Sequence, residues 1–176
     1  MKDPLDYLFT LLVPFRTIIG KDHEKYSNHV QRVFFNCLII DRNHDNHEKY
    51  AIAAVFHDIG IWTNYTIDYL DPSIAQAKEY LVSSGQSHWT EEISSMIFWH
   101  HKTRPYKGPF ELTTEIFRKA DWIDVSLGLI TYGYPKQTIR HFRKRIPNKG
   151  FHFFLFKKIT KNFFLHPLRP LPMFKK

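Results

Sequence analysis

The most informative stretch of the chain is Ala53-Ala54-Val55-Phe56-His57-Asp58-Ile59-Gly60, which ends an apolar helical pattern with an adjacent His and Asp. Neighbouring side chains on a helix diverge by about 100°, so His57 and Asp58 can share an ion only if it lies beside the end of their helix. His29 and Asp121 lie on two other helical stretches. Imidazole and carboxylate together suit a divalent first-row ion that keeps positions open for water and substrate. The sequence therefore predicts a metalloenzyme.

The apolar spacing is helical along almost the whole chain, and Gly and Pro fall between the segments. Strand signals are weak. The expected helices cover about 5–19 with an interruption at Pro14, 23–40, 47–57, 72–83, 90–100, 113–130, 135–147 and a last segment after Gly150. Gly20 and Gly60 are expected to end the first and third helices. The fold class is therefore all-α.

Four motifs occur in a fixed order along the chain. They are His29-Val30-Gln31-Arg32-Val33, the stretch 53–60, Ile97-Phe98-Trp99-His100-His101 and Lys119-Ala120-Asp121. Together they resemble the HD-domain superfamily of metal-dependent phosphohydrolases, over roughly residues 23 to 130. The resemblance implies a bundle of about six to eight helices around a metal ion held by His29, His57, Asp58 and Asp121. The ion would be Mn, Co, Ni, Mg, Zn or Fe.

The resemblance also suggests roles within the site. Asp58 would hold both the ion and the hydrolytic water, which makes it the first catalytic candidate. His100 shares a helical face with Ile93 and Ile97, so we expect it to be a further ligand or a proton donor. His101 is adjacent, and it either joins the catalytic group or lies outside the ligand set.

The sequence leaves open whether a second ion binds. Family members with two metals carry further His residues between the His-Asp pair and the later His pair, whereas this interval holds only His88, too near His100. Asp71-Pro72 occupies roughly the expected place. Gly133-Tyr134-Pro135 is similar to a cyclic-dinucleotide phosphodiesterase signature, but it follows Asp121 instead of the His pair. We interpret it as a turn.

Three cations are candidates for binding a substrate phosphate. Arg32 lies one helical turn after His29, and Lys102 and Arg104 follow the His pair in a loop. A guanidinium can bind a phosphate bidentately. The alternatives are that Arg32 pairs with a carboxylate such as Asp124, and that Lys102 and Arg104 are solvated loop charges.

Length and charge divide the chain unevenly. A chain of 176 residues fits one domain, and we expect it over 1–148, followed by a basic, Phe-rich segment over 149–176 with a Pro-containing tail. After Asp124 the chain holds 12 of its 25 Lys and Arg and none of its 17 Asp and Glu. This asymmetry favours an anionic partner for the C-terminal end. The single Cys37 excludes a disulfide within the chain.

The C-terminal segment carries a broad apolar band opposite a cluster of lysines. The band comprises Phe151, Phe153, Phe154, Phe156, Ile159, Phe163 and Phe164, and the lysines are Lys157, Lys158 and Lys161. Packing of the band against the domain is the favoured interpretation. The alternatives are an anionic membrane surface, helped by basic residues over 140–145, and nucleic acid, for which no recognition motif is present. Neither a secretion signal nor a membrane-spanning run is evident, so we expect a cytoplasmic protein, with peripheral membrane attachment as the alternative.

Three functions follow from these features. The leading one is hydrolysis of a phosphomonoester or phosphodiester of a nucleotide or small metabolite by a metal-activated water. The second is iron-dependent oxygenase or hydratase chemistry on the same ligands. The third is a non-catalytic metal-containing module that acts through its basic tail.

Overall fold

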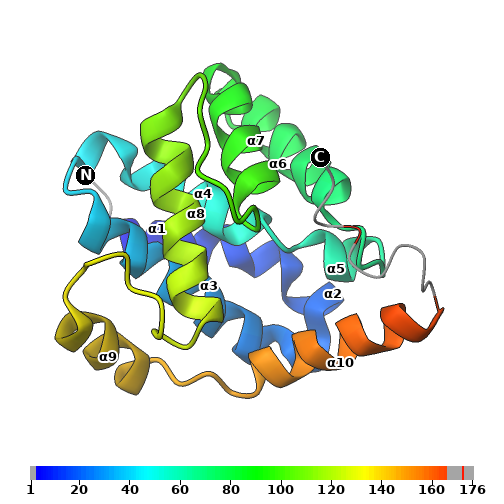
Figure 1. Cartoon of the computed structure of the whole chain (residues 1–176). Coiled ribbons are helices and arrows are strands. Elements are labelled where there is room, and N and C mark those ends of the chain that lie inside the picture. Colours follow the sequence, from blue (N-terminus) through cyan, green and yellow to red (C-terminus); the bar gives the residue numbers. More distant parts are fainter. Residues whose placement is uncertain (1–2, 166–171, 173–176) are drawn as a thin grey trace.

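The computed structural model describes residues 3–165 and 172, and every regular element within them is helical (Figure 1). The helices of nine residues or more are α1 (Pro4–Leu12), α3 (His23–Ile40), α4 (His47–Phe56), α6 (Leu70–Ser83), α7 (Thr90–Trp99), α8 (Glu111–Val125), α9 (Lys136–Arg145) and α10 (Phe151–Leu165). Two short helices, α2 (Arg16–Ile19) and α5 (Gly60–Thr63), and four 3₁₀ turns join them. The all-α prediction is confirmed. The Pro-containing tail, apart from Pro172, lies outside the described residues.

The first helical segment breaks where the sequence predicts a break. Asp3 caps α1 by accepting a hydrogen bond from the Leu5 backbone N–H at 2.8 Å, and Pro4 occupies the first turn, which needs no donor. Pro14 lies in a 3₁₀ turn that separates α1 from α2. Gly20 then adopts a φ of +58°, a conformation that costs glycine little, and the chain turns into α3.

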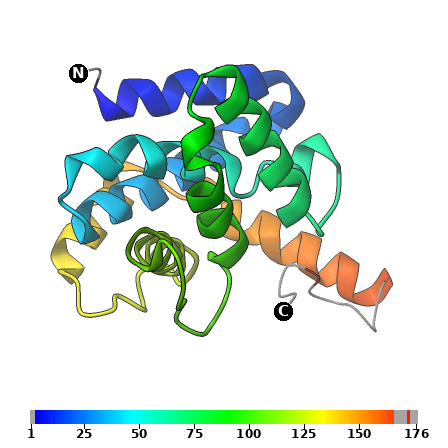
Figure 2. The same ribbon diagram turned by 90° about the horizontal axis from the view of Figure 1, so that it is seen from above.

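The helices form layers around α3 and α4. Figure 2 shows α1 on one side of the molecule and α8 on the other, with α3 and α4 between them. The buried side chains of this core are predominantly apolar, and Val30, Val33, Phe34 and Cys37 give α3 a fully buried face. Because α3 packs against both α4 and α8, His29 on α3 lies between the helix that precedes His57-Asp58 and the helix that carries Asp121.

Gly60 has a different role from the one the sequence predicts. It does not end α4, which stops at Phe56, but begins α5 after a turn over residues 57–59. A Cβ at this position would lie 2.6 Å from the backbone O of Tyr69. Glycine is therefore required for close approach of two backbone segments rather than for a helix end.

The helix that carries Asp121 is shorter than predicted, since α8 ends at Val125 instead of near residue 130. Leu127 and Gly128 both adopt positive φ, of 59° and 78°. Positive φ is incompatible with continuing a right-handed helix. The apolar residues that suggested a longer helix, such as Leu129, are exposed in the following loop.

The C-terminal helix divides its aromatic band between two environments. Phe151 is fully buried, and Phe154 stacks on Trp62 with ring centroids 5.4 Å apart. Four other members of the band are exposed to solvent, namely Phe153, Phe156, Phe163 and Phe164. The packing interpretation therefore holds for one side of α10 only. No helix among the described residues is long and apolar enough to cross a membrane.

Candidate metal centre

Four helices direct ionisable side chains to one point in the core. His29 comes from the middle of α3, and Asp121 comes from α8. His57 caps α4 and Asp58 follows it in the turn, so the pair lies at the end of its helix, where both side chains can face one point. The pair His100 and His101 follows the end of α7 in the same way. All but His101 are at most 1 % exposed.

The predicted ligands lie within a few ångströms of one another. His29 Nε2 is 2.9 Å from His57 Nε2, 3.7 Å from Asp58 Oδ2 and 3.6 Å from Asp121 Oδ1. His57 Nε2 is 3.4 Å from Asp58 Oδ2 and 3.9 Å from Asp121 Oδ1. The fold therefore brings together all four residues that the sequence assigns to the metal.

The histidines are oriented through their second ring nitrogens. His57 Nδ1 donates to the backbone O of Ala54 at 2.7 Å, and His100 Nδ1 donates to that of Ile97 at 2.6 Å. His29 Nδ1 contacts Asp124 Oδ2 at 2.8 Å. Because Nδ1 of each ring is engaged with one of these acceptors, it is Nε2 that faces the cluster, and Nε2 offers a lone pair in the tautomer that carries its proton on Nδ1. Two such lone pairs facing each other at 2.9 Å require a proton or a cation between them.

The later histidine pair extends the cluster on the far side of Asp58. His100 Nε2 lies 3.5 Å from Asp58 Oδ1, and His101 Nδ1 lies 3.7 Å from Asp121 Oδ2. Two groups have the spacing of metal ligands, namely His29, His57 and Asp58, and Asp58, His100 and His101. They share Asp58. Asp71, which occupies the place where two-metal members carry a further ligand, is instead exposed on α6.

Buried polar atoms without a hydrogen-bond partner concentrate in this cluster. Among the described residues they include Asp58 Oδ1, His100 Nε2 and both carboxyl oxygens of Asp121. A buried polar atom left unpaired costs roughly 1–3 kcal/mol, and more when it is charged. Several such atoms converging on one point fit a bound cation, which would accept electron pairs from all of them.

Burial and mutual charge set the ionisation of the cluster. Burial lowers the pKa of His57 to about 3, although Asp58 opposes this shift. Burial raises the pKa of Asp121 to about 7, against the influence of His100 and His29. Burial acts to raise the pKa of Asp58 as well, but His57, His100 and His101 together hold it well below its usual range. Without an ion, the two buried carboxyl groups therefore differ in pKa, since that of Asp58 is lowered and that of Asp121 is raised.

Arg32 pairs with a carboxylate, which is one of the two arrangements that the sequence leaves open. Its side chain is 2 % exposed, and it donates from Nε to Asp124 Oδ1 at 2.6 Å and from Nη2 to Oδ2 at 2.9 Å. Its Nη1 donates to the backbone oxygens of Ile146 and Pro147. Burial opposes ionisation of Asp124, but His29 and Arg32 hold the pKa of that carboxyl well below its usual range. The arginine therefore supports the orientation of His29 through Asp124.

Neither Lys102 nor Arg104 lines the cavity that adjoins the ligand cluster on the side of His101. Lys102 is 9 % exposed, and its Nζ lies 4.6 Å from the centre of the Phe98 ring. Burial lowers the pKa of this amine. Arg104 is exposed on the loop after α7. Their role in phosphate binding stays a prediction.

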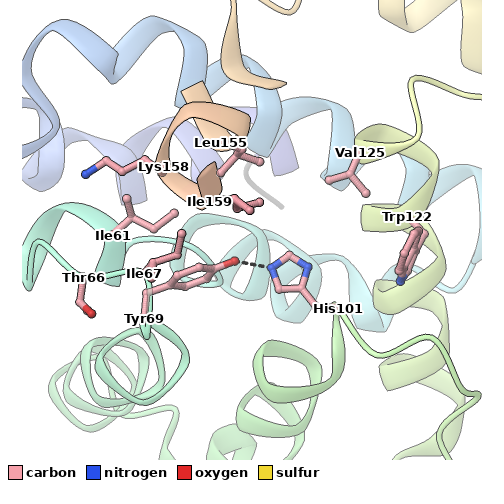
Figure 3. A pocket seen from close by; sticks show the side chains of 10 residues that line it. All are labelled: Ile61, Thr66, Ile67, Tyr69, His101, Trp122, Val125, Leu155, Lys158 and Ile159. Carbon is pink, nitrogen blue, oxygen red and sulfur yellow. Dashed lines mark hydrogen bonds between the residues drawn. The ribbon is translucent and has the colours of Figure 1, made fainter. Parts of the chain in front are cut away.

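A cavity adjoins the cluster on the side of His101 and was not evident from the sequence. It has a volume of about 170 Å³ and is lined by Ile61, Thr66, Ile67, Tyr69, His101, Trp122, Val125, Leu155, Lys158 and Ile159. Figure 3 shows Tyr69 and His101 pointing toward one another, joined by a hydrogen bond. The one sequence feature connected with Tyr69 is Gly60, because the absence of a side chain there lets the backbone O of Tyr69 approach closely.

One comparison with known protein families matches the part of the chain that carries this cluster. The model of the HD domain matches residues 26–126, which include all six residues of the cluster. The chain therefore belongs to the HD domain family, which places it in a superfamily of metal-dependent phosphohydrolases. Comparisons with curated proteins and with solved structures found no match.

Proposed function

We propose that this protein is a metal-dependent phosphohydrolase that cleaves a phosphomonoester or phosphodiester with a metal-activated water. The single observation that carries the proposal is the convergence of four imidazoles and two carboxylates, several of whose buried polar atoms lack partners. Membership in the HD domain family supports the same reaction class.

The proposal assigns each residue a task. His29, His57, Asp58 and Asp121 would hold the first ion, and Asp58 together with His100 and His101 is the group that would be available for a second. A bound divalent ion lowers the pKa of its water and polarises a phosphoryl oxygen. Asp58 has one carboxyl oxygen near His29 and the other near His100, and as a ligand it would also orient the hydrolytic water. His100 serves as a further ligand or as the proton donor at Nε2.

The two alternative functions make different demands. Iron-dependent oxygenase or hydratase chemistry would use the same ligands, so the identity of the bound ion distinguishes it from hydrolysis. A non-catalytic module would act through the basic C-terminal segment. Here α10 is part of the wall beside the cluster, so deleting the segment would also alter the site. Point substitutions are therefore the better test.

The deciding experiment measures metal content and turnover in the same preparation. Protein purified without added metal is assayed by elemental analysis and then against a panel of phosphomonoesters and phosphodiesters with Mn, Co, Ni and Mg. We expect stoichiometric metal and turnover that Asp58→Asn abolishes, because an amide has neither the charge nor the acceptor geometry of the carboxylate. Asp6→Asn, an exposed carboxylate on α1, is the matched control and should behave as wild type.

Three results would contradict the proposal. Stoichiometric iron without any phosphoester turnover would favour the oxygenase or hydratase. Full turnover in Asp58→Asn would remove the assigned site, and absence of metal would favour the non-catalytic module.

A further inference from the structure

The cavity beside the cluster has apolar walls and one polar corner. Leu155 and Ile159 reach it from α10, Ile61 from α5 and Val125 from the end of α8. In Figure 3 these side chains surround the Tyr69–His101 pair. His101 Nδ1 lies 3.7 Å from Asp121 Oδ2, so the polar corner is where the cavity meets the ligand cluster.

Most of the remaining polar lining is already engaged, since the Thr66 hydroxyl accepts a hydrogen bond from the Asp68 backbone N–H at 3.0 Å. Trp122 donates its Nε1 to the backbone O of Lys102 at 3.3 Å. The Lys158 amino group points away from His101, and its aliphatic stem lines the wall (Figure 3). A polar or charged group buried without partners is strongly disfavoured. The cavity is thus suited to an apolar group and not to the base and sugar of a nucleotide.

The volume of the cavity limits the size of the apolar group that it can hold. An apolar cavity of about 150 Å³ in another protein stays dry and binds benzene. The cavity here, at about 170 Å³, is of similar size. A short alkyl chain or a single ring would fill it, while a group attached to its polar end would reach the residues of the cluster.

We infer that this cavity binds the apolar organic group of the substrate, so that the enzyme acts on an amphiphilic phosphoester with its phosphoryl group at the ligand cluster and a short alkyl or aryl group between α5, α8 and α10. This inference rests on the proposed function for the reaction, but the cavity binds its ligand whether or not hydrolysis follows. It makes α10 part of the substrate site.

The inference is tested with two soluble probes that cannot be hydrolysed, methylphosphonate and hexylphosphonate, and with the corresponding phosphate monoesters. Calorimetric binding to the protein as purified should strengthen by about fourfold for each added methylene until the cavity is filled, as expected from the free energy of burying one methylene. The ratio kcat/KM for the monoesters should rise in parallel.

Variants on opposite walls test the location. Ile159→Ser on α10 and Val125→Ser on α8 should each reduce the preference for the hexyl probe. Because the two substitutions lie on different helices, the test still works if one of the variants fails to fold. Phe156→Ser is the matched control, because this side chain of α10 is 65 % exposed and does not line the cavity. It should keep the wild-type preference.

The outcomes separate the two proposals. Equal binding of the two phosphonates, or a preference that survives both wall substitutions, would overturn the cavity assignment even if phosphoesters are hydrolysed. Preferential hexylphosphonate binding that the wall variants abolish would support the cavity even if no phosphoester is turned over, in which case the proposed hydrolysis fails.

Discussion

The ring of Phe151, the first residue of α10, stacks on the ring of the metal-ligand candidate His29. Their centroids are 4.1 Å apart and their planes differ by 17°. Phe151 is fully buried, and the next residue, His152, contacts the backbone O of Asp124 through Nε2 at 2.9 Å. The C-terminal helix is thereby anchored directly behind the ligand cluster.

Phe151→Ala should destabilise the protein by about 3–5 kcal/mol, because it leaves a cavity where a large buried side chain was lost. It should also lower the metal content, since His29 loses the ring that limits its orientation. Chemical denaturation and elemental analysis measure both effects. Phe151→Leu retains most of the volume and should cost less. Wild-type stability and metal content in Phe151→Ala would show that the contact has no supporting role.

Arg32→Ala should destabilise the protein by about 3 kcal/mol, because removing one partner leaves the buried Asp124 carboxylate with less compensation. Metal content should fall too, since Asp124 orients His29. Arg32→Lys keeps the charge but loses the bidentate geometry, so we expect an intermediate effect. Unchanged stability and metal content, with weaker substrate binding alone, would instead support direct phosphate contact by Arg32.

The stability of the metal-free protein should depend on Asp121. Its pKa is raised from 3.8 to about 7, so between these pH values the folded state binds more protons than the unfolded state, and the free energy of unfolding falls as pH rises. His57 has its pKa lowered to about 3 and acts in the opposite direction. Comparison of wild type with Asp121→Asn therefore isolates the carboxyl group.

Chelator-treated wild type and Asp121→Asn are compared by denaturation at about pH 4.5 and about pH 7.5, which bracket most of this window. The wild type should lose stability relative to the variant at the higher pH. Metal binding should reduce this loss, because the ion favours the ionised carboxylate. A difference between the two proteins that does not change with pH would contradict the assignment.

The solvent-facing side of α10 should bind an anionic membrane surface. Its four exposed Phe residues lie beside Lys157 and Lys161, and no acidic residue follows Asp124. We expect co-sedimentation with vesicles of phosphatidylcholine and phosphatidylglycerol, weaker binding to phosphatidylcholine alone, and loss of binding in the double variant Phe153→Ser/Phe164→Ser. Equal binding by that variant would show that a membrane is not the occupant.

The local signals predicted much of the helical framework. The bounds of α3 agree with the prediction at both ends, because its apolar spacing is uninterrupted between His23 and Ile40. The early end of α8 was not predictable from apolar spacing, since the positive φ of Leu127 has no signature in its residue type. Likewise, Gly60 indicated a helix end, but the actual constraint is a close contact with the backbone O of Tyr69, just before α6.

The candidate ligands and their order could be predicted from the sequence, because the His-Asp pair, the flanking His29 and Asp121, and their helical spacing are local properties of the chain. Only the tertiary structure decided that Arg32 pairs with Asp124, that Tyr69 contacts His101, and that α10 closes the cavity. Each of these depends on segments between about 30 and 90 residues apart, whose meeting is set by the packing of the whole core and not by any local pattern.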